Sequence, residues 1–477
     1  KVRYYTLKNG FTVIMSINKD EPRLQTMIAT KAGSNTDPST HTGLAHYLEH
    51  MLFKGTDQFG SLDWSKEKPY LDQIDALYEQ YNSTTDERKR TSIYANIDSV
   101  SGVAAKYAIA NEYDKLMSFI GAKGTNAFTS YEQTVYINDI PSNQIERWLT
   151  VEAERFRKPI FRLFHTELEA VYEEKNRTLD NDDWKVNEVM MANLFPTNNY
   201  GQQTTIGTIE HLKNPSLLEI RKYFEKNYVP NNMCMILVGD FNPDSTIALV
   251  DKKFGGFEAK EVTPYIPPKE ADMTTPIEKT VIGPKDEWVT IGYRMPGANT
   301  KEANLLQFTD RILANGTAGL LDIDLIQKQK VLEAVSYAQT MKDYSVYELD
   351  AKPKEGQSLE AVKTLLLNEI DLLKKGNFDD VLIQAVKNNF QKELLQKMEH
   401  NNNRAMVLLD GFITGVNRTD ELAFYEKKKK YTKNDIVAFA NKWFANNYVV
   451  VYKKTGTDTS ILKVNKPLIH EVEVNRN

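Results

Sequence analysis

The stretch His41-Thr-Gly-Leu-Ala-His-Tyr-Leu-Glu-His-Met-Leu-Phe53 decides how this chain folds and what it can bind. Within it, His46, Glu49 and His50 stand at i, i+3 and i+4, a spacing that places their side chains on one face of a helix. The helix is predicted by apolar residues at helical spacing, namely Leu44, Leu48, Met51 and Leu52. Two imidazoles one turn apart can bind one Zn²⁺, and the carboxylate between them can accept a proton from an activated water.

The pattern H-x-x-E-H is rare in a chain with only 7 histidines. About 0.01 occurrences per chain of this composition are expected by chance. The alternative is a helix with two ordinary histidines, and a third ligand elsewhere in the chain would argue against it. The residues that precede the helix favour a helix start. They are Pro38, the hydroxyl-bearing Ser39, Thr40 and Thr42, and Gly43.

Length and composition define the broad class of the protein. A chain of 477 residues is longer than one hydrophobic core usually serves, so two or more domains are expected. The net charge of −5 offers no basic surface for nucleic acid, and the single cysteine, Cys234, excludes an intramolecular disulfide and a cysteine-based zinc site. No apolar run reaches the roughly 18 residues that suggest a membrane span. Because the chain begins at Lys1 and opens on a strand pattern, we expect that an N-terminal segment has been removed.

The first half of the chain alternates strands and helices. A hairpin is predicted at residues 4–16, around Asn9-Gly10. Further strands are predicted at residues 26–31, 124–137 and 233–238, and helices at 145–157, 167–179 and 217–227. Residues 60–110 differ, because two highly charged amphipathic segments indicate a helical hairpin inserted at the surface. This alternation predicts an α/β layer with the metal site on the side that faces the sheet.

The second half of the chain repeats this plan. Phe224-x-x-Asn227-Tyr228-Val229 recurs as Phe444-x-x-Asn447-Tyr448-Val449, each time between a helix and an apolar strand, which indicates a duplicated domain. Prolines and charges at residues 258–275 mark a boundary. We therefore predict a catalytic domain at 1–257 with a helical insertion at about 60–110, a linker at 258–280, a second homologous domain without metal ligands at 281–457, and a tail or connector at 458–477.

An acidic helix is the candidate source of a third ligand. The segment Glu167-Leu-Glu-Ala-Val-Tyr-Glu-Glu-Lys-Asn176 places Glu167 and Glu174 two helical turns apart on one face. Considered alone, such a run of acidic residues is more often a solvated surface than a metal site. The residues by themselves leave both interpretations open.

Together, the H-x-x-E-H helix and the acidic helix make the chain resemble the pitrilysin, insulin-degrading enzyme and mitochondrial processing peptidase family of zinc peptidases with the inverted motif. Three further segments carry the resemblance. Residues 50–56 resemble the continuation of the family's metal helix, residues 126–130 with Thr134 and Tyr136 resemble its substrate-binding edge strand, and residues 228–233 with Val238-Gly-Asp240 resemble the end of its first domain. The resemblance covers residues 1–460.

The resemblance implies a role for each matching residue. His46, His50 and Glu174 would be the ligands of one Zn²⁺ per chain, with Glu49 as the general base. Glu167 would be the acidic neighbour that supports the ligands. The residues expected to meet the peptide substrate by backbone pairing are Asn126, Ala127 and Phe128.

Two departures from the family pattern shape the prediction. Glu174 follows His50 by 124 residues, and the helical insertion would absorb the roughly fifty residues in excess of the family's spacing. The family also completes its site with an arginine and a tyrosine from the facing half. Residues 317–334 contain no arginine, Ala334 stands near the expected tyrosine, and Tyr337 is the nearest substitute. We therefore predict one half of a clamshell, whose partner is a C-terminal half of the same chain, a homologous subunit or a second copy.

The predicted fold class is α+β, with two homologous α/β domains that form this half. The predicted function is that of a zinc endopeptidase that hydrolyses peptides or unfolded segments in an enclosed chamber. The alternatives are a non-catalytic structural or assembly subunit of the same fold, a half that is inactive without its partner, and a metal-binding protein of unrelated fold. Similar helical insertions in relatives favour the bacterial periplasm or envelope as the compartment.

Overall fold

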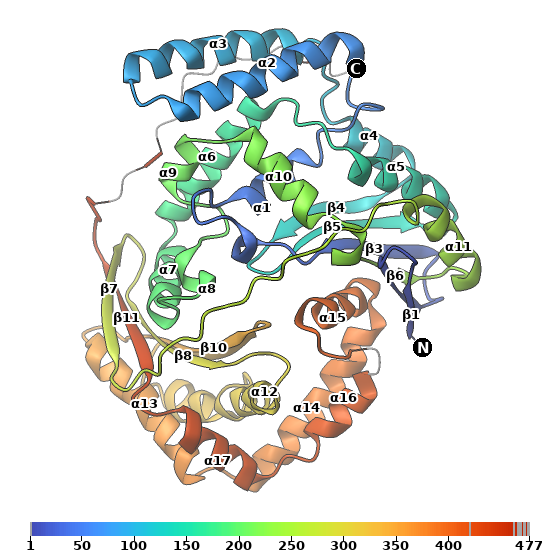
Figure 1. Cartoon of the computed structure of the whole chain (residues 1–477). Coiled ribbons are helices and arrows are strands. Elements are labelled where there is room, and N and C mark those ends of the chain that lie inside the picture. The colour runs from blue at the N-terminus through green and yellow to red at the C-terminus, as the bar shows by residue number, and fades with distance from the viewer. Residues whose placement is uncertain (1, 419–420, 461–462, 465–469, 471–473, 475–477) are drawn as a thin grey trace.

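Two mixed β-sheets, each packed with helices, form the framework of the chain (Figure 1). The computed structural model describes residues 2–418, 421–460, 463–464, 470 and 474. The arrangement confirms the predicted α+β class. Among these residues, no helix combines the length and the apolar content needed to cross a membrane.

The first sheet has six strands in the order β1-β2-β6-β3-β5-β4. They are β1 (Val2–Thr6), β2 (Thr12–Ile17), β3 (Arg23–Thr30), β4 (Lys123–Thr129), β5 (Thr134–Pro141) and β6 (Met233–Gly239). β2 and β6 are parallel, and the other neighbours are antiparallel. Because β4 lies at the edge, its outer backbone groups are available to another extended chain.

The second sheet has five strands in the order β7-β11-β8-β10-β9. They are β7 (Ile277–Gly283), β8 (Trp288–Pro296), β9 (Glu333–Thr340), β10 (Tyr344–Lys352) and β11 (Tyr448–Thr455). β7 and β11 are parallel and the other pairs antiparallel, which is the pattern of β2-β6-β3-β5-β4 in the first sheet. The recurring F-x-x-N-Y-V sequence also lies at equivalent places, where α10 (Leu217–Asn227) leads into β6 and α17 (Lys433–Trp443) leads into β11.

Helices cover both faces of each sheet. The main core of the first sheet includes α1 (Leu44–Met51), α5 (Ile145–Arg157), α6 (Phe164–Asp180) and α10, and its other face packs against α15 (Asn401–Thr414). The main core of the second sheet includes α12 (Lys301–Leu313), α13 (Leu359–Lys375), α14 (Asp380–Glu399) and α17, and its other face packs against α7 (Asp182–Leu194). Each half of the chain thus lends one helix, α7 or α15, to the sheet of the other half.

A helical hairpin forms within residues 60–110. Its helices, α2 (Trp64–Ser83) and α3 (Glu87–Ala105), lie beyond α6 and α10, on the side away from the first sheet (Figure 1). Leu71, Ile74 and Tyr78 of α2 are buried in the main core, so the hairpin is packed onto the domain. The remaining helices are α4 (Glu112–Phe119), α8 (Asn199–Gln202), α9 (Ile209–Lys213), α11 (Pro243–Phe254) and α16 (Glu421–Lys428).

Residues 124–137, predicted as one strand, instead form a hairpin of β4 and β5. The single-strand prediction is wrong because the turn at 130–133 has only Ser130 from the residue types that favour turns, which is a weak signal. Tertiary contacts hold this turn. The carboxylate of Glu132 accepts a hydrogen bond from the Tyr200 hydroxyl and from the N–H of Lys342 in the β9–β10 turn (3.0 Å). The equivalent hairpin turns of the two sheets therefore meet.

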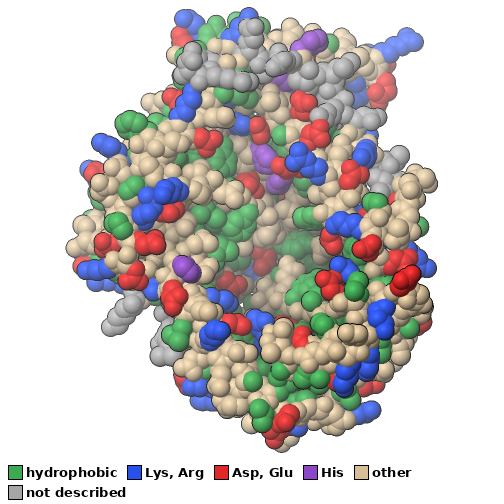
Figure 2. Space-filling view, turned by 180° about the vertical axis from the view of Figure 1, so that it is seen from behind, with side chains coloured by type: hydrophobic (Ala, Val, Ile, Leu, Met, Phe, Trp, Pro, Cys, Tyr) green, Lys and Arg blue, Asp and Glu red, His purple; other side chains and the backbone are tan. Residues whose placement is uncertain are grey.

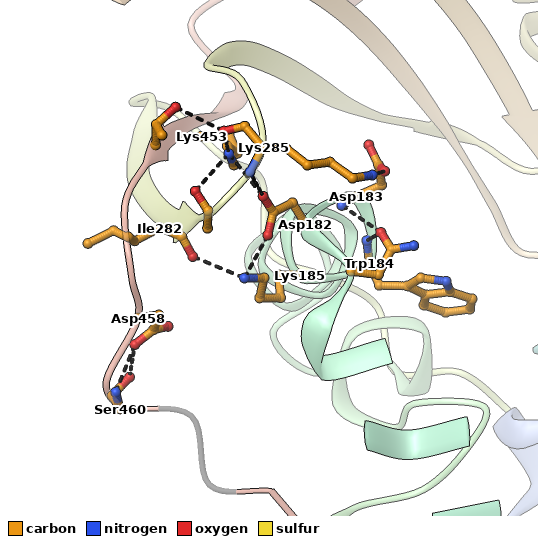
Figure 3. A network of polar contacts seen from close by, with 12 residues as sticks. Asp182, Asp183, Trp184, Lys185, Ile282, Lys285, Lys453, Asp458 and Ser460 are labelled. Carbon is orange, nitrogen blue, oxygen red and sulfur yellow. Dashed lines mark hydrogen bonds and ion pairs between the residues drawn. The ribbon is translucent and has the colours of Figure 1, made fainter. Parts of the chain in front are cut away.

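A buried charge network joins α7 to the second sheet (Figure 3). Asp182 on α7 and Lys453 on β11 have no exposed side-chain surface, and Asp182 Oδ2 lies 2.9 Å from Lys453 Nζ. Lys185 Nζ lies 2.7 Å from Asp182 Oδ1, and Lys453 Nζ also donates to the carbonyl oxygens of Gly283 (3.0 Å) and Asp286 (3.1 Å). Because these groups come from both halves of the chain, the network fixes the helix on the sheet.

Two segments outside the regular elements connect the halves. Residues 258–276 form no helix or strand and join α11 to β7. Beyond β11 the chain returns to the first half, where Val464 is buried beside α6. The side chain of Asn176 accepts from the N–H of Val464 (2.9 Å) and donates to its carbonyl (3.0 Å). The domain limits given above remain predictions.

Candidate metal centre

Gly43 and Asp37 determine where the motif helix α1 begins. Gly43 has φ +87°, and an added Cβ would meet the opposite backbone, so the position requires glycine. The carboxylate of Asp37 accepts hydrogen bonds from the N–H groups of Gly43 (2.7 Å) and Ala45 (3.0 Å), while burial raises the pKa of Asp37 to about 8. The prediction that hydroxyl groups start the helix is wrong, because the preceding loop folds back and brings Asp37 to these amides. The Thr42 hydroxyl contacts His211 Nδ1 instead (2.7 Å).

The predicted ligands His46, His50 and Glu174 converge in space. The Nε2 atoms of the two histidines are 3.3 Å apart. Glu174 Oε2, which α6 supplies, lies 3.3 Å from His46 Nε2 and 3.7 Å from His50 Nε2. Throughout the described part of the chain, this is the one group of three histidine, cysteine or acidic residues whose ligand atoms lie within 4.8 Å of one another.

This donor set fits a zinc ion. Two imidazole nitrogens that face each other beside a carboxylate are the same donor types as the His₂Glu set of known catalytic zinc sites, which leaves a fourth position open. The side chains of His46, His50 and Glu174 are 14, 19 and 38% exposed, so water and substrate can reach them. Figure 2 shows purple histidine surface at the edge of a hollow in the middle of the molecule.

Glu167 and Lys54 lie behind the predicted ligand His50. His50 Nδ1 lies 3.1 Å from Glu167 Oε2, and Lys54 Nζ forms an ion pair with the other oxygen of Glu167. Burial disfavours protonated His50, but the carboxylates around it outweigh burial and raise its pKa. Burial likewise opposes charge on Glu167, yet hydrogen bonds from His50 and Lys54 lower its pKa. The hydrogen bond from His46 lowers the pKa of Glu174, because it outweighs burial, which would raise this pKa. The carboxylates of Glu167 and Glu174 therefore favour their ionised forms, which attract a cation.

Glu49 faces the edge strand β4. Its carboxylate accepts a hydrogen bond from the Thr129 hydroxyl, at the end of that strand. Ala127 packs on the α1 side of the sheet, whereas Phe128 packs on the face that α15 covers. Asn126 shares the face of Phe128 because side chains alternate along a strand. The three residues predicted to meet the substrate thus lie on the sheet edge beside the predicted general base.

The second sheet does not bring its candidate tyrosine to the ligands. Tyr337 lies on β9, where its hydroxyl donates to Glu348. Sequence reasoning also missed three residues that support the site, which are Asp37, Lys54 and Thr129. Lys54 follows His50 by one helical turn, and this spacing could have revealed it. Asp37 and Thr129 reach the site through a loop reversal and strand pairing, which give no local signal.

Two family models match the chain. A model described as insulinase (peptidase family M16) matches residues 13–101 and 100–207, and one described as peptidase M16 inactive domain matches residues 216–390. The first covers every predicted site residue, from the motif helix through Glu174.

Individual proteins and structures agree with these matches. The chain is 24% identical to the zinc protease PqqE of Helicobacter pylori over 469 residues, which cover 96% of this chain and 92% of that protein. The crystal structure of a protease from Helicobacter pylori superposes with a TM-score of 0.78 at 22% identity and covers 95% of this chain and 99% of that one. The periplasmic protease PqqL of Escherichia coli superposes with a TM-score of 0.73 at 15% identity, covering all of this chain but 51% of that one. These structural likenesses establish the fold.

Proposed function

Because the chain belongs to the insulinase family of peptidases, family M16, we propose that it is a zinc-dependent endopeptidase that hydrolyses peptides or unfolded segments in an enclosed chamber. The observation that carries this proposal is the convergence of His46, His50 and Glu174 from two helices, next to an edge strand. A metal-binding protein of unrelated fold is excluded by the family match.

The residues of the site divide the work of peptide hydrolysis. His46, His50 and Glu174 would hold the zinc ion, which when bound polarises the peptide carbonyl and lowers the pKa of water so that attack occurs near neutral pH. Glu49 would take the proton from the attacking water and give it to the leaving amine. Glu167 would accept the Nδ1–H of His50, which keeps Nε2 unprotonated and directed at the ion.

The edge strand β4 would bind the substrate. An extended peptide can add to β4 as a further strand, because every second residue of an antiparallel edge strand directs its N–H and C=O groups away from its neighbour β5. The outward-directed members of the series Asn126, Ala127 and Phe128 would provide these groups beside Glu49. Main-chain pairing favours unfolded segments of varied sequence, since a folded protein has no extended chain to offer.

A second half would close the chamber. This chain corresponds to 51% of the periplasmic protease PqqL, and residues 317–334 contain no arginine. We infer that the arginine and tyrosine expected in the family come from a C-terminal half of the same chain, a homologous subunit or a second copy. The description of PqqL as periplasmic supports the bacterial periplasm or envelope as the compartment.

A non-catalytic subunit of the same fold is the second candidate. The model described as an inactive domain matches residues 216–390, so members of the family include domains without activity. The presence of His46, Glu49, His50 and Glu174 in one site favours the peptidase, because a purely structural role does not require all four.

Cleavage of a quenched fluorescent peptide, with zinc measured in the same samples, tests the proposal. Wild type is expected to bind about one zinc ion, and Glu49→Gln should keep the zinc but lose about 10³-fold in turnover. Glu146→Gln, an exposed position on α5, is the matched control and should change neither value. If wild type binds zinc but does not turn over the peptide, an incomplete clamshell is supported. Adding the partner half should then restore turnover. A chain that binds no zinc would refute the site.

A further inference from the structure

Arg162, between α5 and α6, is a buried arginine whose five N–H donors are all used. Its Nε and Nη2 donate to the carboxylate of Glu67 on α2, at 2.9 and 3.1 Å, and the Glu67 side chain has no exposed surface. The other donors reach backbone carbonyl oxygens of the loop that follows the motif helix. These are Lys54 (2.6 Å), Thr56 (2.8 Å) and, more distantly, Phe59 (3.4 Å). One guanidinium therefore connects the helical insertion to this loop.

The loop at residues 54–60 is shaped around this guanidinium. Gly55 and Gly60 both have φ +91°. A Cβ added at Gly55 would lie 2.9 Å from Arg162 Nη1, and one added at Gly60 would lie 2.6 Å from it. Both positions therefore require glycine, for the backbone conformation and for space. The N–H of Thr56 closes the loop on the carbonyl of Phe59 (2.9 Å). Because charge-assisted bonds from a planar group are directional, Arg162 specifies one conformation of the loop.

The same loop carries the lysine that supports the ligands. Arg162 holds the carbonyl of Lys54, and Lys54 Nζ forms an ion pair with Glu167. Glu167 in turn lies 3.1 Å from His50 Nδ1. A continuous series of direct contacts thus leads from Glu67 on α2 to His50.

We propose that Glu67 and Arg162 are positioning residues of the metal site, through which the helical insertion places Lys54 and thereby orients His50. The inference rests on the proposed zinc site. A purely stabilising role makes a different prediction. Any contact that anchors the insertion firmly would then affect the metal site as much as the Glu67–Arg162 pair does. The chain offers a comparison, because Asp75 on α2 also pairs with Arg221 on α10 (2.5 Å), without touching the loop.

The rate of zinc release distinguishes a positioning role of Glu67 and Arg162 from a purely stabilising one. Glu67→Gln and Lys54→Met are expected to release zinc to a chromogenic chelator about 10-fold faster than wild type. Asp75→Asn, the matched control, should stay within about twofold of wild type. In the double variant of Glu67 and Lys54 the rate should equal that of Lys54→Met alone, because both changes act through one contact. Lys54 is partly exposed, so Lys54→Met remains informative if Glu67→Gln does not fold.

Amide hydrogen exchange in the metal-free protein gives a readout that does not depend on zinc. The N–H groups of Thr56 and Ile160, which donate to Phe59 and Gly55, should exchange faster in Glu67→Gln than in Asp75→Asn. Equal zinc release from Glu67→Gln and Asp75→Asn, or additive effects in the double variant, would overturn the inference. If wild type binds no zinc, the proposed function fails, whereas the exchange comparison still reports whether Glu67 holds the loop.

Discussion

Replacing Asp182 with asparagine should loosen α7 from the second sheet, because the fully buried pair of Asp182 and Lys453 would lose one of its charges. The Asp182 carboxylate lies 2.9 Å from Lys453 Nζ and 2.7 Å from Lys185 Nζ, and it accepts the N–H of Lys285 (3.0 Å). Burial works against the charged carboxylate, but these partners outweigh it and lower the pKa of Asp182 to about 2. The folded state therefore favours the ionised form.

The size of the effect follows from this pKa. A change from 3.8 to about 2 on folding corresponds to about 2 kcal/mol of stability at neutral pH. Because the folded pKa is depressed, the contribution is present above the unfolded pKa and is lost as the pH falls through the folded pKa, with about half gone at pH 3. Asp182→Asn also leaves Lys453 buried without its carboxylate, so we expect a total loss of about 3 kcal/mol at pH 7.

Urea unfolding of wild type and Asp182→Asn at pH 7 and pH 3 measures this difference. It should be about 3 kcal/mol at pH 7 and about 1 kcal/mol smaller at pH 3. The neighbouring Asp183→Asn is the matched control, because the side chains of Asp183 and its partner Lys285 are 67 and 54% exposed, and it should cost less than about 0.5 kcal/mol. A pH-independent difference, or one no larger than that of the control, would refute the reasoning.

Two further changes test how the site is assembled. Thr129→Val removes the hydrogen bond to Glu49 and should lower kcat about tenfold with zinc content unchanged, as peptide turnover and metal analysis would show. A loss of zinc would mean that Thr129 supports the ligands instead. Gly43→Ala forces a side chain into φ +87° and against the backbone of Ile206, and urea unfolding should show a loss of about 2 kcal/mol. An unchanged midpoint would contradict the tight start of α1.

The parts of the site that the sequence predicts well are those that one helix fixes. His46, Glu49 and His50 share a face because their spacing matches the helical period, and no tertiary information is needed to place them together. Glu174 is different. Its spacing from Glu167 shows only that the two share a face of α6, and its prediction as the third ligand came from the family resemblance.

The residues missed by sequence reasoning reach the site through tertiary structure. Asp37 caps α1 because a loop reverses direction, and Thr129 reaches Glu49 because β4 packs against the motif helix. The exchange of α7 and α15 between the sheets is also absent from local patterns, because hydrophobic periodicity shows that a helix has an apolar face but not which sheet covers it. The β4–β5 turn escaped notice for a related reason, since the contacts of Glu132, not turn residues, stabilise it.

The second sheet has the strand pattern of the first, but no group of potential metal ligands is found among its described residues. Helix α12 follows β8 and packs against β9, as α1 follows β3 and packs against β4. The Ser336 hydroxyl donates to Asp310 on α12 (2.7 Å), much as the hydroxyl on β4 donates to Glu49. Here, however, α12 has no histidine, and its Arg311 pairs with Glu393 of α14 (3.2 Å). Each sheet thus has a helix with a carboxylate that accepts a hydrogen bond from a hydroxyl of its edge strand, and the two histidines of α1 beside Glu174 distinguish the candidate metal centre from the second sheet.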